Sequence, residues 1–352
     1  VALSVYDDGG GPELYAGVFD AIMGGTDGTV DKWNGTSWEH VSSHFSGSVL
    51  AFTVYDDGRG AALYGGGFGH VNGMSGAEGI ARWDGTAWST VGAGLDGSVS
   101  ALAVYDDGGG AALYAGGSFT NAGGGSTNRI AKWDGTSWSA LTSGLSSSVE
   151  TLAVYDDGGG AALYAAGQFV MYAGGVPTNR IAKWNGTSWS RLGSGVNGLV
   201  SALAVYDDGS GPALYAGGYF TNAGGVAASR IAKWDGTSWS RLGSALSNGV
   251  NGSVAALAVY DDGGGPALYA GGAFTLAGGG AASNIAKWDG TSWSPLGSGM
   301  SGSGNRHVDA LTVYDDGSGP ALYAGGSFTL AGGGAARNIA KWDGSSWSAF
   351  GG

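Results

Sequence analysis

The chain has 352 residues, 75 of them glycine, and a formal net charge of −13. It contains no cysteine, which excludes disulfides, thiol catalysis and cysteine-ligated metals. Its acidic balance, with only 15 dispersed Lys and Arg, argues against nucleic-acid binding. No run of about 20 apolar residues occurs, so we expect no membrane insertion. The chain begins at Val1 inside a repeat, and we interpret it as a mature or excised region with an extracellular or cell-surface location.

One short pattern organises the chain: two tryptophans flank an Asp-Gly or Asn-Gly step, as in the segment from Trp133 to Trp138. Glycine, and the Asp or Asn before it, tolerate the positive φ of a hairpin turn, so the pattern predicts a β-hairpin. A period of about 50 residues built on hairpins is typical of a repeat protein. The pattern occurs seven times and uses all 14 tryptophans; the first of each pair is Trp33, Trp83, Trp133, Trp184, Trp234, Trp288 or Trp342.

The third copy shows the expected elements in chain order. Its alternating apolar residues predict four short strands, over 100–105, 112–117, 129–133 and 138–141. A turn that contains Asp106 and Asp107 joins the first two strands, and a glycine-rich loop over 121–128 joins the second to the third. The Trp hairpin joins the third to the fourth. Four short antiparallel strands per copy predict one blade of a β-propeller.

The fold class that we predict is therefore all-β: a seven-bladed β-propeller with four antiparallel strands per blade. Inner strands that converge on an axis have room only for small side chains, and the first two strands of each copy are rich in Ala and Gly. An open β-solenoid and tandem small domains are the alternatives. Because each copy supplies four strands, we expect no closing blade shared between the termini. We predict a single domain over 1–352, with copies at about 1–47, 48–97, 98–147, 148–198, 199–252, 253–306 and 307–352.

The second strand and the Trp pair carry a family resemblance. The run Leu113-Tyr114-Ala115-Gly116-Gly117, followed by two spaced aromatic residues, resembles the kelch repeat. In that family a double glycine ends the second strand, and two aromatic residues mark the third and fourth. The resemblance covers all seven copies, although the first aromatic is Trp rather than Tyr and the turn between the two is shorter. It implies kelch-like blades. Galactose-oxidase chemistry in kelch-like relatives requires a cysteine cross-linked to tyrosine, and this chain has no cysteine.

The most prominent polar feature is an Asp-Asp pair followed by glycines, which recurs in every copy and is exemplified by Asp106 and Asp107. One interpretation is a calcium loop, since paired carboxylates supply hard oxygen ligands. In the other, one Asp accepts backbone N–H bonds of its own turn while the second is solvated. We favour the second interpretation and expect no metal or cofactor. Lys132 and its equivalents precede each first Trp, and we expect them to snorkel or to pair with an Asp.

The copies differ from one another mainly in two kinds of segment. The Asp-Asp turn and the Trp hairpin are constant, whereas the loop between the second and third strands and the connection between copies vary. In a propeller these variable segments share one end, and function tends to reside on loops held by a rigid scaffold. The candidate binding residues are therefore His70, Met74, Glu78, Glu150, Tyr172, Tyr219, Arg306, His307 and Asp309.

Among these candidates, Glu150 and Asp309 occupy the same position of the repeat, at the start of the innermost strand. Both carboxylates should approach the mouth of a central channel, where a pair could act in acid–base catalysis. Three blade steps would separate them, however, and we favour ordinary solvated charges. The histidines, which include His40 and His44, show no metal-ligand spacing.

The sequence favours a non-enzymatic interaction or structural module that is monomeric and binds a protein or a polysaccharide. The alternative is a multivalent glycan-binding propeller, in which several blades each bind sugar. Tyr172 and Tyr219 are the only tyrosines outside the repeated positions, so they are the first candidates for sugar contacts. An enzyme that uses the channel mouth is a third hypothesis, with no catalytic motif to support it.

Overall fold

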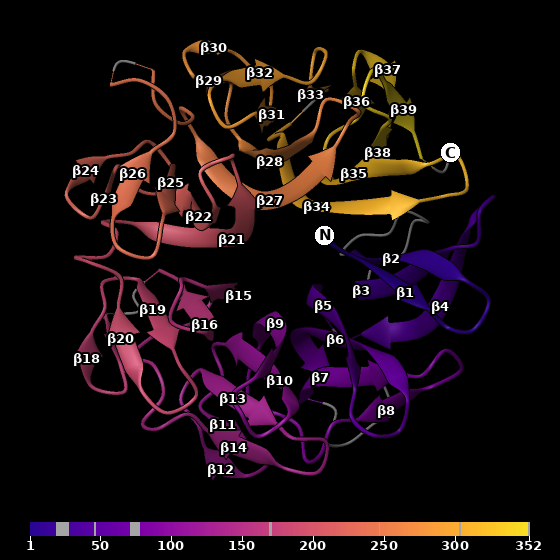
Figure 1. Cartoon of the computed structure of the whole chain (residues 1–352). Helices are drawn as coiled ribbons and strands as arrows, with labels where there is room; N and C mark the ends of the chain where they lie inside the picture. Colours follow the sequence, from indigo (N-terminus) through magenta and orange to yellow (C-terminus); the bar gives the residue numbers. More distant parts are fainter. Residues whose placement is uncertain are drawn as a thin grey trace. The chain divides into compact units, whose positions relative to one another are not determined.

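The protein was analysed as a computed structural model, which describes residues 1–18, 28–45, 47–70, 78–168, 171–245, 247–302 and 304–350, and only the backbone of residues 18, 42–45 and 70. Within these residues every regular element is a β-strand (Figure 1). The strands form seven four-stranded antiparallel sheets, and each sheet is drawn from a single copy of the repeat. The prediction of an all-β chain with four strands per copy is therefore confirmed. No helix among the described residues is long and apolar enough to cross a membrane.

The chain divides into two compact units, and the first comprises residues 1–156 and 160–191. It holds the four sheets of copies one to four. Their strands are β1 (Ala2–Asp7), β2 (Pro12–Val18), β3 (Gly28–Trp33) and β4 (Trp38–Phe45); β5 (Val49–Asp56), β6 (Ala61–His70), β7 (Glu78–Trp83) and β8 (Trp88–Thr90); β9 (Val99–Asp106), β10 (Ala111–Gly117), β13 (Ile130–Trp133) and β14 (Trp138–Ala140); and β15 (Thr151–Asp156), β16 (Ala161–Ala166), β19 (Ile181–Trp184) and β20 (Trp189–Arg191).

The second unit comprises residues 157–159 and 192–352, and holds the sheets of copies five to seven. Their strands are β21 (Leu199–Asp207), β22 (Pro212–Tyr219), β25 (Ile231–Trp234) and β26 (Trp239–Arg241); β27 (Ser253–Asp261), β28 (Pro266–Ala273), β31 (Ile285–Trp288) and β32 (Trp293–Pro295); and β34 (His307–Asp315), β35 (Pro320–Ser327), β38 (Ile339–Trp342) and β39 (Trp347–Ala349).

The strands of copy three match the predicted ones to within one residue at each end. The predicted loop over 121–128 differs, because it contains a small hairpin. Four copies have such a hairpin and copy seven has a three-stranded version: β11 (Asn121–Ala122) and β12 (Gly125–Ser126); β17 (Tyr172–Ala173) and β18 (Val176–Pro177); β23 (Asn222–Ala223) and β24 (Val226–Ala227); β29 (Leu276–Ala277) and β30 (Gly280–Ala281); and β33 (Met300–Ser301), β36 (Leu330–Ala331) and β37 (Gly334–Ala335).

The Trp hairpin forms as predicted, but for a partly different reason. Trp133 pairs with Trp138 across β13 and β14, and their ring centroids are 5.4 Å apart. Within the turn only Gly135 has a positive φ, of 97°. Asp134 instead accepts the backbone N–H groups of Thr136 and Ser137, both at 2.8 Å. The aspartate therefore acts by capping the turn with its side chain, not by tolerating a left-handed backbone.

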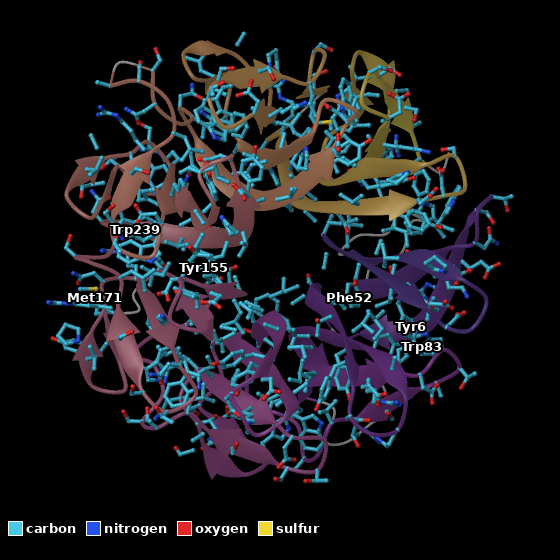
Figure 2. All side chains as sticks on the ribbon, in the orientation of Figure 1. Tyr6, Phe52, Trp83, Tyr155, Met171 and Trp239 are labelled. Carbon is cyan, nitrogen blue, oxygen red and sulfur yellow. The ribbon has the colours of Figure 1, made fainter. Side chains whose placement is uncertain are left out.

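Within each unit, successive sheets pack face to face. A side chain at Gly116 in β10 would approach Cγ1 of Val149, from the next copy, to 2.6 Å, which explains why a glycine occupies this packed face. The Tyr105 hydroxyl donates to the Ala161 carbonyl of the next sheet at 3.0 Å. In the first unit, Tyr6 of the first sheet and Trp83 of the second belong to one buried cluster, and Figure 2 shows them side by side.

The sheets have two distinct ends. At the first, which we call the turn end, the Asp-Asp turn of one copy meets the Trp hairpin of a later copy: a side chain at Gly135 would come within 2.8 Å of the Asp57 carbonyl oxygen. At the other, the loop end, the connections that follow copies two to six pair with the next loop, as in the bridge between Leu145 and Ala173. This arrangement confirms that the constant segments share one end and the variable segments the other.

Candidate functional site

The turn end is closed by hydrogen bonds within each copy. The first Asp of each described pair behaves as predicted: Asp106 Oδ1 accepts the backbone N–H groups of Gly108 at 2.8 Å and Gly110 at 2.9 Å. The glycines are needed because the left-handed region that Gly108 and Gly110 occupy, at φ of 96° and 101°, disfavours other residues. The first carboxylate is therefore a cap on its own turn.

The second Asp differs from the prediction that it is solvated. Asp107 Oδ2 accepts the Tyr114 hydroxyl at 2.9 Å and also pairs with the Lys132 ammonium group, so the expected pairing of the lysine is confirmed. The same group of Asp, Tyr and Lys recurs in copy five as Asp208, Tyr215 and Lys233. Tyr114 is fully buried, and an Asp at this position is therefore needed to satisfy its hydroxyl.

The pKa shifts follow from these contacts. Burial disfavours the charged form of Asp208, but hydrogen bonds from Lys233, Ser210 and Tyr215 outweigh burial and hold the pKa of Asp208 at about 2. Burial, together with the Asp208 contact, raises the pKa of Tyr215 well above its ordinary value. The carboxylate oxygens are thus occupied by donors within the chain, and a calcium ion at this turn would have to displace them. The turn end is organised for stability.

At the loop end, single side chains accept hydrogen bonds from the backbone N–H groups of the neighbouring loop. Asp96 lies in the connection between copies two and three, and its carboxylate accepts the backbone N–H groups of Thr120 at 2.6 Å and of Asn121 at 2.8 Å. Asn197 and Asn251 make the equivalent pair of bonds in later connections, and Ser146 makes them with its hydroxyl. Different side chains can therefore hold the same loop geometry.

A β-bulge at the start of the first strand, in copies two, three, five, six and seven, presents one variable side chain. In copy seven the pairing shifts between Val308 and Ala310, so Asp309 is the extra residue. Such a bulge redirects the inserted side chain without breaking the sheet. The bulge residues, in chain order, are Leu50, Ser100, Ser201, Ala255 and Asp309. Glu150 occupies the same repeat position in copy four, directly before β15.

The predicted charged residues lie at or beside this repeat position. Glu150 directly precedes β15 and accepts a hydrogen bond from Ser148 Oγ at 3.2 Å. His307 Nε2 lies 3.3 Å from Asp309 Oδ1, and both side chains are about one-third exposed. Arg306, in the preceding connection, donates to the Gly302 carbonyl at 3.3 Å. The structure thus brings His307 and Asp309 together, whereas Glu150 belongs to the other unit.

Both predicted tyrosines are exposed at the loop end. Tyr219, the last residue of β22, is 60% exposed, and the Arg230 guanidinium carbon lies 4.5 Å from the centroid of its ring. Tyr172, in β17, is 54% exposed. Its neighbour Met171 also points outward at the edge of the first unit (Figure 2). Exposed aromatic rings beside charged groups can stack on apolar faces of a ligand.

In copy two, Glu78 is exposed at the start of β7, and its backbone pairs with that of His70 at the end of β6. The His70 side chain and the whole of Met74 lie outside the described residues. Phe68, which sequence reasoning missed, is 53% exposed two residues before His70. Its signal was comparison among copies: it stands where Ser118, Tyr219 and Ala273 stand elsewhere.

A second missed feature is a buried acid in copy one. Asp31 in β3 is 1% exposed, whereas the same position in other copies is alanine, for example Ala131. Asp31 faces His40 across the β3–β4 pair, and the His40 Nδ1 lies 2.9 Å from Asp31 Oδ1. Thr29 Oγ1 donates to the other carboxylate oxygen at 3.3 Å. Asp31 and His40 both depart from the repeat, and their pairing could have been noticed from the hairpin register.

One order of side chains occurs in both units. In the first unit, an exposed aromatic residue in copy two (Phe68) precedes a copy with serine at the corresponding position (Ser118) and at the bulge (Ser100). Glu150 then follows in copy four. In the second, Tyr219 in copy five precedes a copy with alanine at these positions and then Asp309 in copy seven. The loop end therefore carries two candidate sites of similar composition, one in each unit.

Serial four-stranded antiparallel sheets with a constant end and a variable end define a propeller-like all-β repeat protein. No protein-family model matches the chain, so the kelch assignment has no support beyond the resemblance of its residues, and no curated protein matches it. Solved structures do match the fold. Two are crystal structures of the extracellular domain of BT4673 from B. thetaiotaomicron, described as a one-component system in one case and as a hybrid two-component system in the other.

These two structures share 11% and 10% sequence identity with the chain, each with a TM-score of 0.58. The match covers 99% of this chain and 38% of those chains. The chain thus spans well under half the length of the proteins that it resembles. At this level of identity the likeness shows a common fold, and a function has to be argued from the residues.

Proposed function

We propose that the chain is a non-catalytic binding domain, formed as one closed seven-bladed propeller over residues 1–352, monomeric and extracellular, that recognises its ligand through the loop end. Seven sheets among the described residues, one for each copy, support the blade count. The likeness to an extracellular domain supports the location. Kelch-like blade geometry, which rests on the double glycine and the Trp pair, is part of the same proposal.

The observation that carries this proposal is the division of labour between the two ends. At the turn end, Asp107 and its equivalents bond to residues of their own copy, such as Tyr114 and Lys132. At the loop end, one position at the start of the first strand presents residues as different as Leu50, Glu150 and Asp309. Variable side chains on a fixed backbone are the usual arrangement of a recognition surface.

We propose no catalytic role for Glu150 and Asp309. Ser148 donates to Glu150, and His307 pairs with Asp309, so each carboxylate has a neighbour within its own copy or connection. Each pair suits the orientation of a polar group of a ligand. A protein partner is the ligand class that we propose first, because the loops at the loop end differ from copy to copy.

Glycan binding is the second candidate, and the repeated order of aromatic, small and acidic residues favours it. One sugar ring of a polysaccharide can stack on Tyr219, while hydroxyl groups of another of its rings donate to a carboxylate such as Asp309. The same order from Phe68 to Glu150 in the other unit would allow one polysaccharide to be held at two sites. Linked sites of this kind raise the overall affinity without any new contact.

The test is electrophoresis through gels that contain single polysaccharides, followed by the variant Tyr219→Ser. We expect a polysaccharide in the gel to retard the unmodified protein. Removal of the exposed ring should lower the affinity for that polysaccharide about tenfold. Asp106→Ser at the turn end is the matched control, and it should leave retardation unchanged. Failure of every polysaccharide to retard the protein would exclude the glycan form. Equal loss with Asp106→Ser would contradict the choice of the loop end.

A further inference from the structure

In copies four, five and six, a side chain fills the space beside the third strand like a plug. The residue directly before that strand has a left-handed backbone and carries a long or polar side chain. In copies three to seven these residues are Arg129, Arg180, Arg230, Asn284 and Asn338, with φ values from 64° to 74°. A left-handed backbone is unusual for arginine, so the position is under a common constraint of the fold.

Three of these plug residues show what the side chain does. Arg230 lies over the Tyr219 ring and donates to the Phe220 carbonyl at 3.2 Å. Arg180 Nε donates to the Gln168 carbonyl at 3.0 Å. Asn284 reaches the Gly272 carbonyl at 3.1 Å and the Arg306 carbonyl at 3.0 Å. The side chain therefore fills the gap between the end of the second strand and the connection to the next copy.

Copy two lacks the plug. Gly79 occupies the same left-handed position, with a φ of 73°, and has no side chain to fill the gap. A cavity of about 320 Å³ is found there instead. Its lining residues include Phe68, Glu78, Gly79, Leu95, Asp96 and Ser98. This volume is at the lower end of the range for pockets that bind small ligands, about 300–1,000 Å³.

The aromatic wall of this cavity matches the surroundings of the Arg230 guanidinium. Phe68 stands at the position of Tyr219 and is 53% exposed, so an aromatic face remains on one side. Leu95, which is 2% exposed, forms an apolar part of the wall. Glu78 and Asp96 add two exposed carboxylates, and no Lys or Arg lines the cavity among the residues that the structure describes. An aromatic face with carboxylates and no competing cation favours a planar organic cation.

We propose that the cavity beside Gly79 binds a guanidinium group supplied by a ligand, in the place where other copies use their own arginine. The cation would stack on Phe68 and pair with Glu78, while the backbone carbonyls of Phe68 and Gly69 correspond to those that Arg180 and Arg230 use in their copies. The cavity shares Phe68 with the loop-end surface proposed above, but the inference does not depend on whether the main ligand is a protein or a polysaccharide.

Asp96 contributes negative charge to the cavity, but its oxygens are not free to bind a ligand directly. Its two oxygens already accept four hydrogen bonds from Thr120 and Asn121, at 2.6 to 2.8 Å. Glu78 is therefore the carboxylate that we expect to contact the ligand directly. One available carboxylate beside an aromatic ring suits an organic cation better than a divalent metal ion. Calcium, for example, requires six or more oxygen ligands.

The test is isothermal titration calorimetry with Nα-acetyl-arginine methylamide and with its citrulline counterpart, a neutral molecule of nearly the same shape. We expect the arginine probe to bind and the citrulline probe to bind at least about tenfold more weakly. Phe68→Ser and Glu78→Asn introduce the residues of copy three, and each should weaken the arginine probe about tenfold. Tyr219→Ser is the matched control in copy five, where Arg230 already fills the site. It should leave binding of the arginine probe unchanged.

A fourth variant, Gly79→Arg, supplies the missing plug and should abolish binding of the probe. Its Cβ would come within 2.5 Å of the Gly97 carbonyl oxygen, so its melting temperature has to be measured as well. If that variant unfolds, Phe68→Ser and Glu78→Asn decide the question. If methylguanidine binds as tightly as the arginine probe, the ligand is a free small molecule. Tighter binding of a blocked arginine peptide would indicate a protein partner.

Three results would overturn the proposal: no heat with the arginine probe at millimolar concentration, equal binding of the citrulline probe, or equal weakening by Tyr219→Ser. None of them bears on polysaccharide retardation by the unmodified chain, which tests the loop-end function separately.

Discussion

The turn end and the loop end of a single sheet come from the same repeat, yet they use polar side chains in opposite ways. At the turn end of copy five, Asp208 bonds to Tyr215 and Lys233, both from its own copy. At the loop end, the main-chain geometry stays constant while the side chains that it carries change. Asp96, Asn197 and Asn251 cap equivalent loops with the same pair of backbone bonds.

This difference shows how a repeat protein can keep a fold and vary a surface. Side chains that hold one another, like Asp107 and Tyr114, can change only together, because an unpaired buried hydroxyl or charge is costly. Side chains that hold only backbone N–H groups can be exchanged for any residue with an acceptor atom. The turn end should therefore be sensitive to substitution and to pH, and the loop end tolerant.

Acid should produce the largest effect. The Ser137 N–H and the Thr136 side chain lower the pKa of Asp134 to about 2, and the contacts of Asp208 hold its pKa at about 2. A carboxyl whose folded pKa is depressed contributes stability above its unfolded pKa and loses it as pH falls through the folded pKa. The free energy of unfolding should stay level from neutral pH to about 5 and fall steeply between about 4 and 2.

Guanidinium denaturation at a series of pH values checks this prediction. A main loss of stability near pH 6 would contradict it, because histidine would then control the transition instead of the turn-end aspartates.

Among single substitutions, Asp208→Ala should cost most, about 2–4 kcal/mol, because it leaves the buried Tyr215 hydroxyl and the Lys233 ammonium without their acceptor. Asp207→Ala is the matched control in the same turn. It removes only the caps on Gly209 and Gly211 and should cost about 1 kcal/mol. Equal losses in chemical denaturation would mean that the contacts of the second aspartate add nothing.

At the loop end, Asp96→Asn should change the free energy of unfolding by less than about 0.5 kcal/mol, since Asn197 and Asn251 already serve as equivalent caps. Asp96→Ala removes the acceptor and should cost about 1–2 kcal/mol. If Asp96→Asn were as damaging as Asp96→Ala, the negative charge would matter and the tolerance that we infer for this end would be wrong.

Removal of divalent ions should have the smallest effect. The carboxylates of Asp106 and Asp107 are occupied by backbone and side-chain donors, so a chelator should move the melting temperature by less than about 2 °C. A fall of more than about 10 °C on addition of chelator would instead support calcium at these turns. Differential scanning calorimetry with and without added calcium makes this measurement.

Most of the local structure was readable from the sequence. Alternation and turn residues located the strands of copy three to within one residue, because a strand and a hairpin are defined by contacts between residues near one another in the chain. Comparison of the copies also separated the constant end from the variable end. Tyr172 and Tyr219 were identified as exceptions to the repeat, and both are exposed.

What the tertiary structure alone decided depends on register and on packing between copies. Asp107 meets Tyr114, seven residues away, and Lys132, 25 residues away, only because three strands align at one level. The bulge that presents Asp309 is a shift of one residue in pairing, which the sequence of the strand does not reveal. The cavity beside Gly79 lies where other copies place a side chain, between residues of two copies, and it becomes visible only when its neighbours are in place.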